Sequence, residues 1–127
     1  MKKEKITIEY TFNKGSLPVL WNLISSPLGL SEWFADNVDN TENQFTFFWD
    51  KNSQNANLIQ SKLNSYVRFQ WEEDEGTNAY FEMKIETQPL TNEIALLVED
   101  FAFKNEKEDI KLLWDHQIET LRRKTGM

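Results

Sequence analysis

The 127-residue sequence contains no cysteine and a single histidine, His116. Without cysteine the chain can form no disulfide, no thiolate metal site and no cysteine nucleophile. One histidine excludes a metal site built from several imidazoles, and any Ser-His-Asp triad would depend on His116 alone. We therefore expect no metal and no cofactor, and we assign no catalytic residue.

Positive charge and long apolar runs are also scarce. The chain has 14 Lys and Arg against 21 Asp and Glu, a formal net charge of −7, whereas nucleic acids bind basic surfaces. No apolar run approaches the about 18 residues that cross a bilayer. Residues 1–5 are charged and lead into an alternating segment, which is not typical of a signal peptide. The sequence predicts a cytoplasmic protein with no nucleic-acid partner and no membrane span.

Aromatic residues, in contrast, are abundant, with nine Phe, five Trp and three Tyr. This content favours a packed globule over a disordered chain. The length predicts one domain over residues 1–127, large enough to form one hydrophobic core.

The first third of the chain predicts one strand and two short helices. Apolar and polar residues alternate over residues 5–13, which indicates a strand with one buried face. Apolar residues then recur at helical spacing over 17–24 and, after Pro27, over 30–34. We expect Trp33 and Phe34 to be core aromatics, and the alternative is that Trp33 lines the mouth of a cavity.

Residues 38–103 predict a series of antiparallel strands, the last over 93–103. Its clearest part is a hairpin of residues 66–72 and 79–87, joined by a three-residue loop that ends on Gly76. In the register set by this loop Phe69 opposes Phe81, Val67 opposes Met83 and Arg68 opposes Glu82, so apolar and ionic pairs agree. Residues 52–57 are too polar to assign, and the register of residues 52–63 stays open.

A long helix over residues 105–124 closes the chain. Asn105 is the expected N-cap, acids occupy the first turn, bases the last, and Gly126 follows. One apolar stripe consists of Ile110, Leu113, Trp114, Gln117, Ile118 and Leu121. The expected core consists of Trp21, Phe34, Phe69, Phe81, Met83, Trp114 and Leu121.

Four segments carry a resemblance to a known family, namely LWNLI (20–24), LSEWF (30–34), DFA (100–102) and LWDHQI (113–118) with Leu121. Through them the chain resembles the START-like (SRPBCC, helix-grip) superfamily, in particular the branch of bacterial domains homologous to the activator of heat-shock-protein-90 ATPase. The resemblance covers essentially the whole chain, and its residues are mostly packing residues, specific for fold and weak for function. It implies an α+β fold in which a curved antiparallel sheet of six to seven strands, in the order strand, two helices, five or six strands, helix, wraps around the C-terminal helix.

The resemblance also implies a cavity between the sheet and the C-terminal helix, and three functions. The first is a binding module for an apolar or amphipathic small molecule, and the second is a protein-interaction domain like the co-chaperone activators. A cyclase- or hydrolase-like enzyme ranks third, because the helix stripe supplies no carboxylate or histidine for acid–base chemistry. The oligomeric state is not predicted. The expected cavity residues are Trp33, Phe47, Trp49, Phe69, Trp71, Phe81, Met83, Leu113, Trp114 and Gln117.

A few polar residues remain as candidates. Gln117 lines the cavity or donates to the backbone of the sheet, and both interpretations stay open because buried amides need partners. His116 is expected at the surface and Asp115 in solvent. For Asp100 a turn or cap role is favoured over a buried acid. The acidic run 72–75 is expected to keep a hairpin tip soluble rather than to bind a cation.

Overall fold

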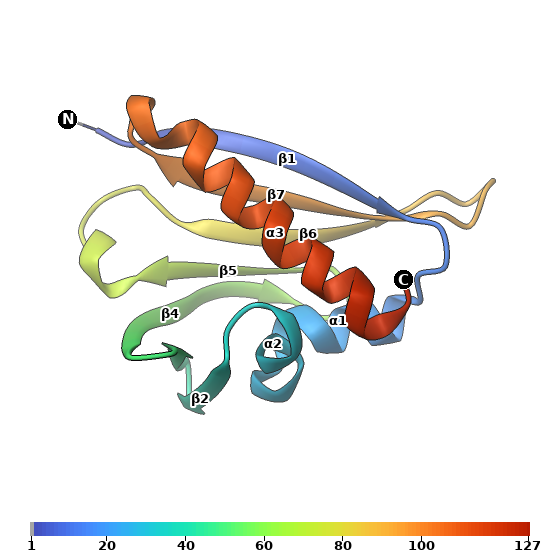
Figure 1. The fold of residues 1–127 in the computed structure, drawn as a ribbon, viewed down its shortest axis with the longest axis horizontal. Helices are drawn as coiled ribbons and strands as arrows, with labels where there is room; N and C mark the ends of the chain where they lie inside the picture. The colour runs from blue at the N-terminus through green and yellow to red at the C-terminus, as the bar shows by residue number, and fades with distance from the viewer. Residues whose placement is uncertain (1) are drawn as a thin grey trace.

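The computed structural model describes residues 2–127, in which a seven-stranded antiparallel sheet is combined with three α-helices (Figure 1). The sheet order is β1-β7-β6-β5-β4-β3-β2, and the predicted element order and α+β class are confirmed. No helix in this part of the chain is long and apolar enough to span a membrane. The elements are β1 (Glu4–Phe12), α1 (Leu17–Ser25), α2 (Pro27–Trp33), β2 (Asn37–Thr41), β3 (Gln44–Trp49), β4 (Asn52–Lys62), β5 (Tyr66–Trp71), β6 (Phe81–Thr87), β7 (Ile94–Ala102) and α3 (Lys107–Thr125).

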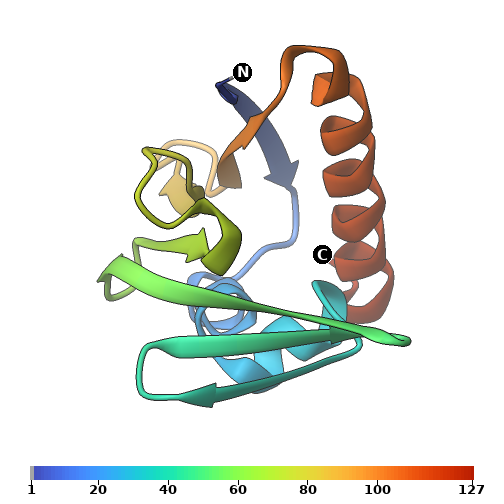
Figure 2. The ribbon, with the colours of Figure 1, turned by 90° about the vertical axis from the view of Figure 1, so that its left-hand side faces the viewer.

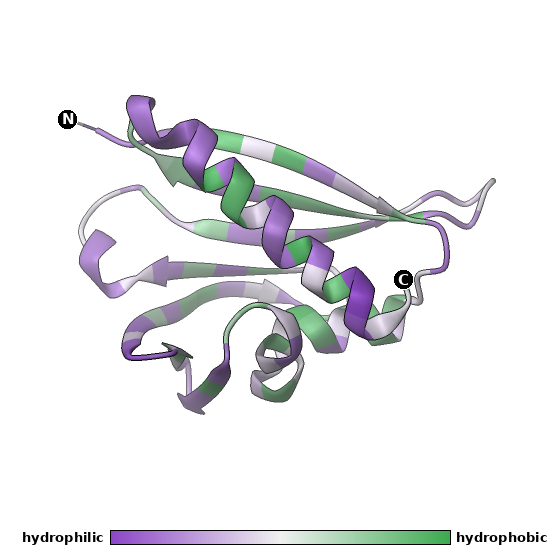
Figure 3. Cartoon of the chain, in the orientation of Figure 1, coloured by the Kyte–Doolittle hydropathy of each residue, from purple (hydrophilic) through white to green (hydrophobic). Residues whose placement is uncertain are grey.

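The sheet curls, and α3 crosses its inner side as a long diagonal (Figures 1 and 2). Helices α1 and α2 lie near the C-terminal end of α3 and occupy that end of the bend. Along the strands apolar and polar residues alternate (Figure 3), since successive side chains of a strand point to opposite faces. One face of the sheet is therefore apolar and turns toward the helices.

The predicted hairpin register between β5 and β6 is confirmed. Phe69 pairs with Phe81, and Arg68 pairs with Glu82, whose side chains form a 2.9 Å ion pair. The connection is wider than the predicted three-residue loop, because pairing stops at Phe69 and residues Glu72–Asp74 form a 3-10 turn. Of the acidic run expected to keep the hairpin tip soluble, Glu72, Glu73 and Glu75 are exposed, whereas Asp74 is buried and paired with Lys3.

Strand β4 contains the polar segment that the sequence left unassigned. Its eleven residues pair with β3 on one side and β5 on the other, with a register shift between Leu58 and Gln60. Within residues 52–57 one side chain, Ala56, is fully buried, while the neighbouring Asn55 accepts a 2.8 Å bond from Thr46. A single small apolar residue gives no visible alternation, so the strand depends on pairing with its neighbours.

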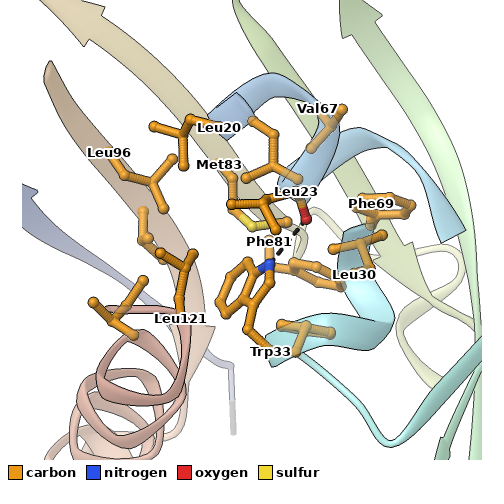
Figure 4. Packing of buried hydrophobic residues seen from close by; sticks show 14 of the residues in the cluster. Leu20, Leu23, Leu30, Trp33, Val67, Phe69, Phe81, Met83, Leu96 and Leu121 are labelled. Carbon is orange, nitrogen blue, oxygen red and sulfur yellow. Dashed lines mark hydrogen bonds between the residues drawn. The ribbon is translucent and has the colours of Figure 1, made fainter. Parts of the chain in front are cut away.

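The hydrophobic core lies between the sheet and the three helices. Six of the seven residues predicted for it are at most 4% exposed, namely Phe34, Phe69, Phe81, Met83, Trp114 and Leu121. The seventh, Trp21, is only partly buried, so that prediction is wrong. Helix α1 packs on α2, and its buried side chains are Leu20, Leu23 and Ile24 rather than Trp21. The indole N–H of Trp33 donates to the Leu23 carbonyl oxygen at 2.9 Å (Figure 4).

Helix α3 begins two residues later than predicted. A 3-10 turn over Lys104–Glu106 precedes it, and the N-cap position is Glu106, without a side-chain cap, so the assignment of Asn105 as N-cap is wrong. At the other end Gly126 adopts φ 75° and its N–H bonds the Arg122 carbonyl oxygen at 2.8 Å. This left-handed residue confirms the predicted end of the helix.

Candidate functional site

A cleft of about 550 Å³ lies along the N-terminal half of α3, between this helix and the inner face of the sheet. Its walls come from segments far apart in the sequence, which only the curvature of the sheet brings together (Figure 2). The lining residues are Lys3, Phe34, Trp49, Asn52, Gln54, Trp71, Glu73, Asp74, Phe81, Asp100, Phe101, Phe103, Glu106, Ile110, Leu113, Trp114 and Gln117.

The apolar part of the cleft is a continuous group of aromatic rings. Ring centroids of Trp71 and Phe81 are 4.9 Å apart, those of Phe34 and Phe81 5.6 Å, and those of Trp49 and Trp71 6.2 Å. Trp114 on α3 completes the group, 5.6 Å from Phe34. These distances are typical of aromatic pairs that hold each other in place. The wall is therefore preformed.

The polar edges of two of these rings are bonded within the protein. The indole N–H of Trp49 donates to the Phe34 carbonyl oxygen at 3.0 Å, and that of Trp114 donates to Asp100 Oδ2 at 2.8 Å. Because its N–H group already has an acceptor, Trp49 presents mainly ring carbon to the cleft, while Trp114, only 3% exposed, supports the wall from within the core.

Gln117 closes one end of the cleft. Its side-chain N–H donates to the main-chain oxygen of Phe34 at 2.9 Å, and the residue also lines the cleft. The two interpretations of Gln117 thus coexist, but the acceptor belongs to the connection between α2 and β2 and not to the backbone of the sheet. A second, smaller hollow of about 310 Å³ lies beyond this bond and includes Trp33 and His116.

Asp100 lies at the charged end of the cleft, and its predicted turn or cap role is wrong. It belongs to β7, where it pairs with Ile6 of β1. Its carboxylate accepts the indole N–H of Trp114 and, at 2.7 Å, the main-chain N–H of Phe101. Burial raises the pKa of Asp100 to about 6, although both hydrogen bonds act in the opposite direction.

Lys3 and Asp74 meet at the same end. Lys3 Nζ lies 3.0 Å from Asp74 Oδ1 and 5.6 Å from the centroid of the Phe103 ring. On the far side of this ion pair another hollow, of about 410 Å³, runs over Gly76 and Asn78. The Lys3–Asp74 pair therefore separates the cleft from the outer surface of the β5–β6 connection.

The structure divides the ten expected cavity residues into two sets. Phe47, Phe69 and Met83 are fully buried behind the cleft lining. Trp33, at the end of α2, is buried against α1 and α3 and lies at the edge of the smaller hollow. The residues that line the cleft itself are Trp49, Trp71, Phe81, Leu113, Trp114 and Gln117.

Sequence reasoning missed the charged half of the cleft. Asp100 stands two and four positions after Val98 and Leu96, both fully buried residues of β7, so the three side chains belong to the same face of the strand. Strict alternation along the strand would therefore have placed the carboxylate on the inner face. For Lys3 and Asp74 no such signal exists, since they are 71 positions apart.

The neighbours of Gln117 on α3 have simpler surroundings. His116 is exposed, as predicted. Asp115 does not point freely into solvent, because its carboxylate accepts the Tyr10 hydroxyl at 2.6 Å and joins α3 to β1. Burial, strengthened by this bond, raises the pKa of Tyr10. Among residues 2–127 no three His, Asp or Glu side chains are arranged so that they could hold a metal ion.

A curved sheet that wraps one long helix, with a cleft between them, defines a helix-grip α+β domain. The sequence model of the START-like superfamily domain matches residues 1–127, and the chain belongs to this superfamily. No curated protein matches it.

Solved structures agree with this assignment. The chain is 39% identical to BfR322 from Bacteroides fragilis, with 97% of this chain and 91% of that one covered and a TM-score of 0.70. The Aha1 dimer from Colwellia psychrerythraea gives a TM-score of 0.78 at 12% identity over 97% and 98% of the chains. CalU16 from Micromonospora echinospora gives 0.73 at 12% identity over 94% and 74%. The last two comparisons show the fold alone.

Proposed function

We propose that this domain binds an apolar or amphipathic small molecule in the cleft between α3 and the sheet. The observation that carries this proposal is the cleft itself, about 550 Å³ in volume and walled by aromatic rings. Ligand pockets commonly measure about 300–1,000 Å³ and combine an apolar lining with a few polar anchors. Gln117 and Asp100 are the anchors that we assign.

The rigidity of the wall supports the same proposal. Phe81 lies between the two other rings: its centroid is 4.9 Å from that of Trp71 and 5.6 Å from that of Phe34. Rings that are fixed before binding lose little side-chain freedom when a ligand arrives, which favours affinity.

A protein-interaction role is the second candidate. Leu112 and Leu113 are 60% and 52% exposed on α3, which favours a contact along this helix. Other large exposed apolar side chains of the described chain lie apart from one another: Leu28 in α2, Leu63 in the turn after β4 and Leu90 in the turn after β6. Partner sites usually form contiguous apolar patches, so ligand binding ranks first.

An enzymatic role ranks third. Asp100 adds to the cleft a carboxyl group whose pKa of about 6 would suit proton transfer. Hydrogen bonds from Trp114 and Phe101, however, hold its two oxygens in a fixed position, and the other carboxylate at this end, Asp74, is tied in an ion pair with Lys3 rather than available as a second acid or base. We therefore assign Asp100 to anchoring a ligand and not to acid–base catalysis.

Two neighbouring leucines allow a direct test. Leu113 lines the cleft, whereas Leu112 lies outside the lining, and both are exposed enough to accept a larger side chain. In calorimetric titrations with 1-naphthylmethanol, the native protein should bind saturably. Leu113→Trp should fill the cleft and weaken binding by about tenfold or more, corresponding to about 1.4 kcal/mol, while Leu112→Trp should bind like the native protein. Absence of saturable binding, or equal loss in both variants, would contradict the proposal.

A further inference from the structure

The charges that line the cleft are strongly unbalanced. Four carboxylates contribute to it, those of Glu73, Asp74, Asp100 and Glu106, whereas among the described lining residues Lys3 carries the only positive charge. The single ammonium is already paired with Asp74 at 3.0 Å. A ligand with a carboxylate head, such as a fatty acid, would bring a further negative charge to this end and would be repelled.

The chain itself places a cation at this end of the cleft. Lys3 Nζ lies between the Asp74 carboxylate and the face of Phe103, at 3.0 Å and 5.6 Å respectively. The Lys3 side chain is 25% exposed, so its ammonium is partly withdrawn from water. A carboxylate on one side and an aromatic ring on the other is a common environment for a bound amine.

The next carboxylate inward, Asp100, adjoins the aromatic wall directly. Trp114 belongs to both regions, because its N–H bonds Asp100 while its ring packs against Phe34 and Phe81. Each carboxylate oxygen can accept two hydrogen bonds, so Asp100 can still accept from a ligand. The pKa of about 6 leaves Asp100 mostly ionised at neutral pH.

From this arrangement we propose that the cleft selects an amphipathic molecule with a positively charged head, a protonated primary amine attached to an apolar or aromatic body. The body lies against Trp49, Trp71 and Leu113, the partly exposed apolar residues of the lining, and the head lies beside Asp100 and Asp74. This inference rests on the proposed function of the same cleft and names the chemical class of the ligand.

In this arrangement Lys3 competes with the ligand for Asp74. The lysine ammonium and the ligand head carry the same charge and share one carboxylate, so each weakens the binding of the other. Removal of the lysine charge should therefore increase the affinity for an amine, decrease it for a carboxylate and leave that for an uncharged alcohol nearly unchanged.

Three probes with the same naphthalene body separate the head group from the cavity. These are 1-naphthylmethylamine, 1-naphthylmethanol and 1-naphthylacetic acid, whose carboxyl group is ionised (the acetate), titrated by calorimetry at neutral pH. We expect the amine to bind the native protein at least about tenfold more tightly than the acetate, with the alcohol between them.

Two pairs of variants then test the residues. Asp100→Asn should abolish most of the preference for the amine, whereas Glu119→Gln, the same change of charge on the exposed side of α3, should preserve it. Lys3→Met should strengthen binding of the amine by about threefold or more, since one competing ion pair is removed. Lys111→Met, an equal change of charge at an exposed position of α3, should leave it unchanged.

The outcomes distinguish the two proposals. If all three probes bind equally, the cleft is a ligand site and the cationic preference is refuted. If the acetate binds best, or Lys3→Met weakens the amine, the preference is refuted as well. If no probe binds, both proposals fall. Because Lys3→Met removes no core side chain, this arm stays informative even if Asp100→Asn does not fold.

Discussion

The side-chain amide of Gln117 donates to the main-chain oxygen of Phe34 across 2.9 Å, although 83 positions separate the two residues. The same oxygen accepts the indole N–H of Trp49 at 3.0 Å. One carbonyl group thus joins α3, the connection after α2 and strand β3. This junction forms the end of the cleft and fixes the distance between the helix and the sheet there.

Replacement of Gln117 by Leu should loosen this junction. We expect a loss of about 0.5–1.5 kcal/mol in the free energy of unfolding, the usual net contribution of one hydrogen bond, because Trp49 still satisfies the Phe34 oxygen. Urea denaturation would measure it. Glu119→Leu, an apolar change at an exposed position two residues away, is the control and should change stability by less than about 0.5 kcal/mol. Equal effects in the two variants would mean that the bond contributes nothing.

Trp114→Ala should be the most destabilising single change on α3. The side chain is 3% exposed and contacts the rings of Trp33, Phe34 and Phe81. Truncation leaves a cavity and an unpartnered Asp100 oxygen, so we expect a loss of about 3–5 kcal/mol. Chemical denaturation would measure the loss. A value below about 1 kcal/mol would show that Trp114 is not part of the core.

Asp100 should make the protein less stable as the pH rises from about 4 to about 6. Its pKa is raised from 3.8 to about 6 in the folded state, so within this window the folded chain holds a proton that the unfolded chain has lost. The stabilising contribution is therefore complete below pH 3.8 and disappears as the pH passes 6. It amounts to at most about 3 kcal/mol, because each pKa unit corresponds to about 1.4 kcal/mol.

The comparison of native protein with Asp100→Asn isolates this contribution. Other groups, among them Glu4, whose pKa the neighbouring Lys107 lowers, titrate in both proteins and cancel in the difference. The difference in the free energy of unfolding, measured by urea denaturation across this range, should move in favour of the variant as the pH rises. A difference that is constant with pH would contradict the assigned pKa.

Local patterns in the sequence determined most of the secondary structure. The register of the β5–β6 hairpin follows from Phe69 opposite Phe81 and Arg68 opposite Glu82, since neighbouring strands joined by a short connection have few alternative pairings. The end of α3 at Gly126 is equally local, because a left-handed residue stops a helix wherever it stands.

The composition of the cleft was decided by tertiary structure. A hydrophobic pattern reports which face of an element is buried, but not which other element lies opposite. For this reason Trp33 and Phe34, adjacent and both buried, take different places: Trp33 packs against α1 and α3, while Phe34 reaches the cleft. Strand β4 shows the same dependence, since its polar residues form a strand only because β3 and β5 pair with it on both sides.

The charged end of the cleft depends on the fold most of all. Asp100 on β7 and Trp114 on α3 come within 2.8 Å only because the sheet curls toward the first half of the helix. Lys3 and Asp74 meet because β1 begins at the same end of the sheet as the β5–β6 connection. Ion pairs and hydrogen bonds between residues so distant in sequence leave no periodic signal, because the contact depends on the path of the whole chain between them.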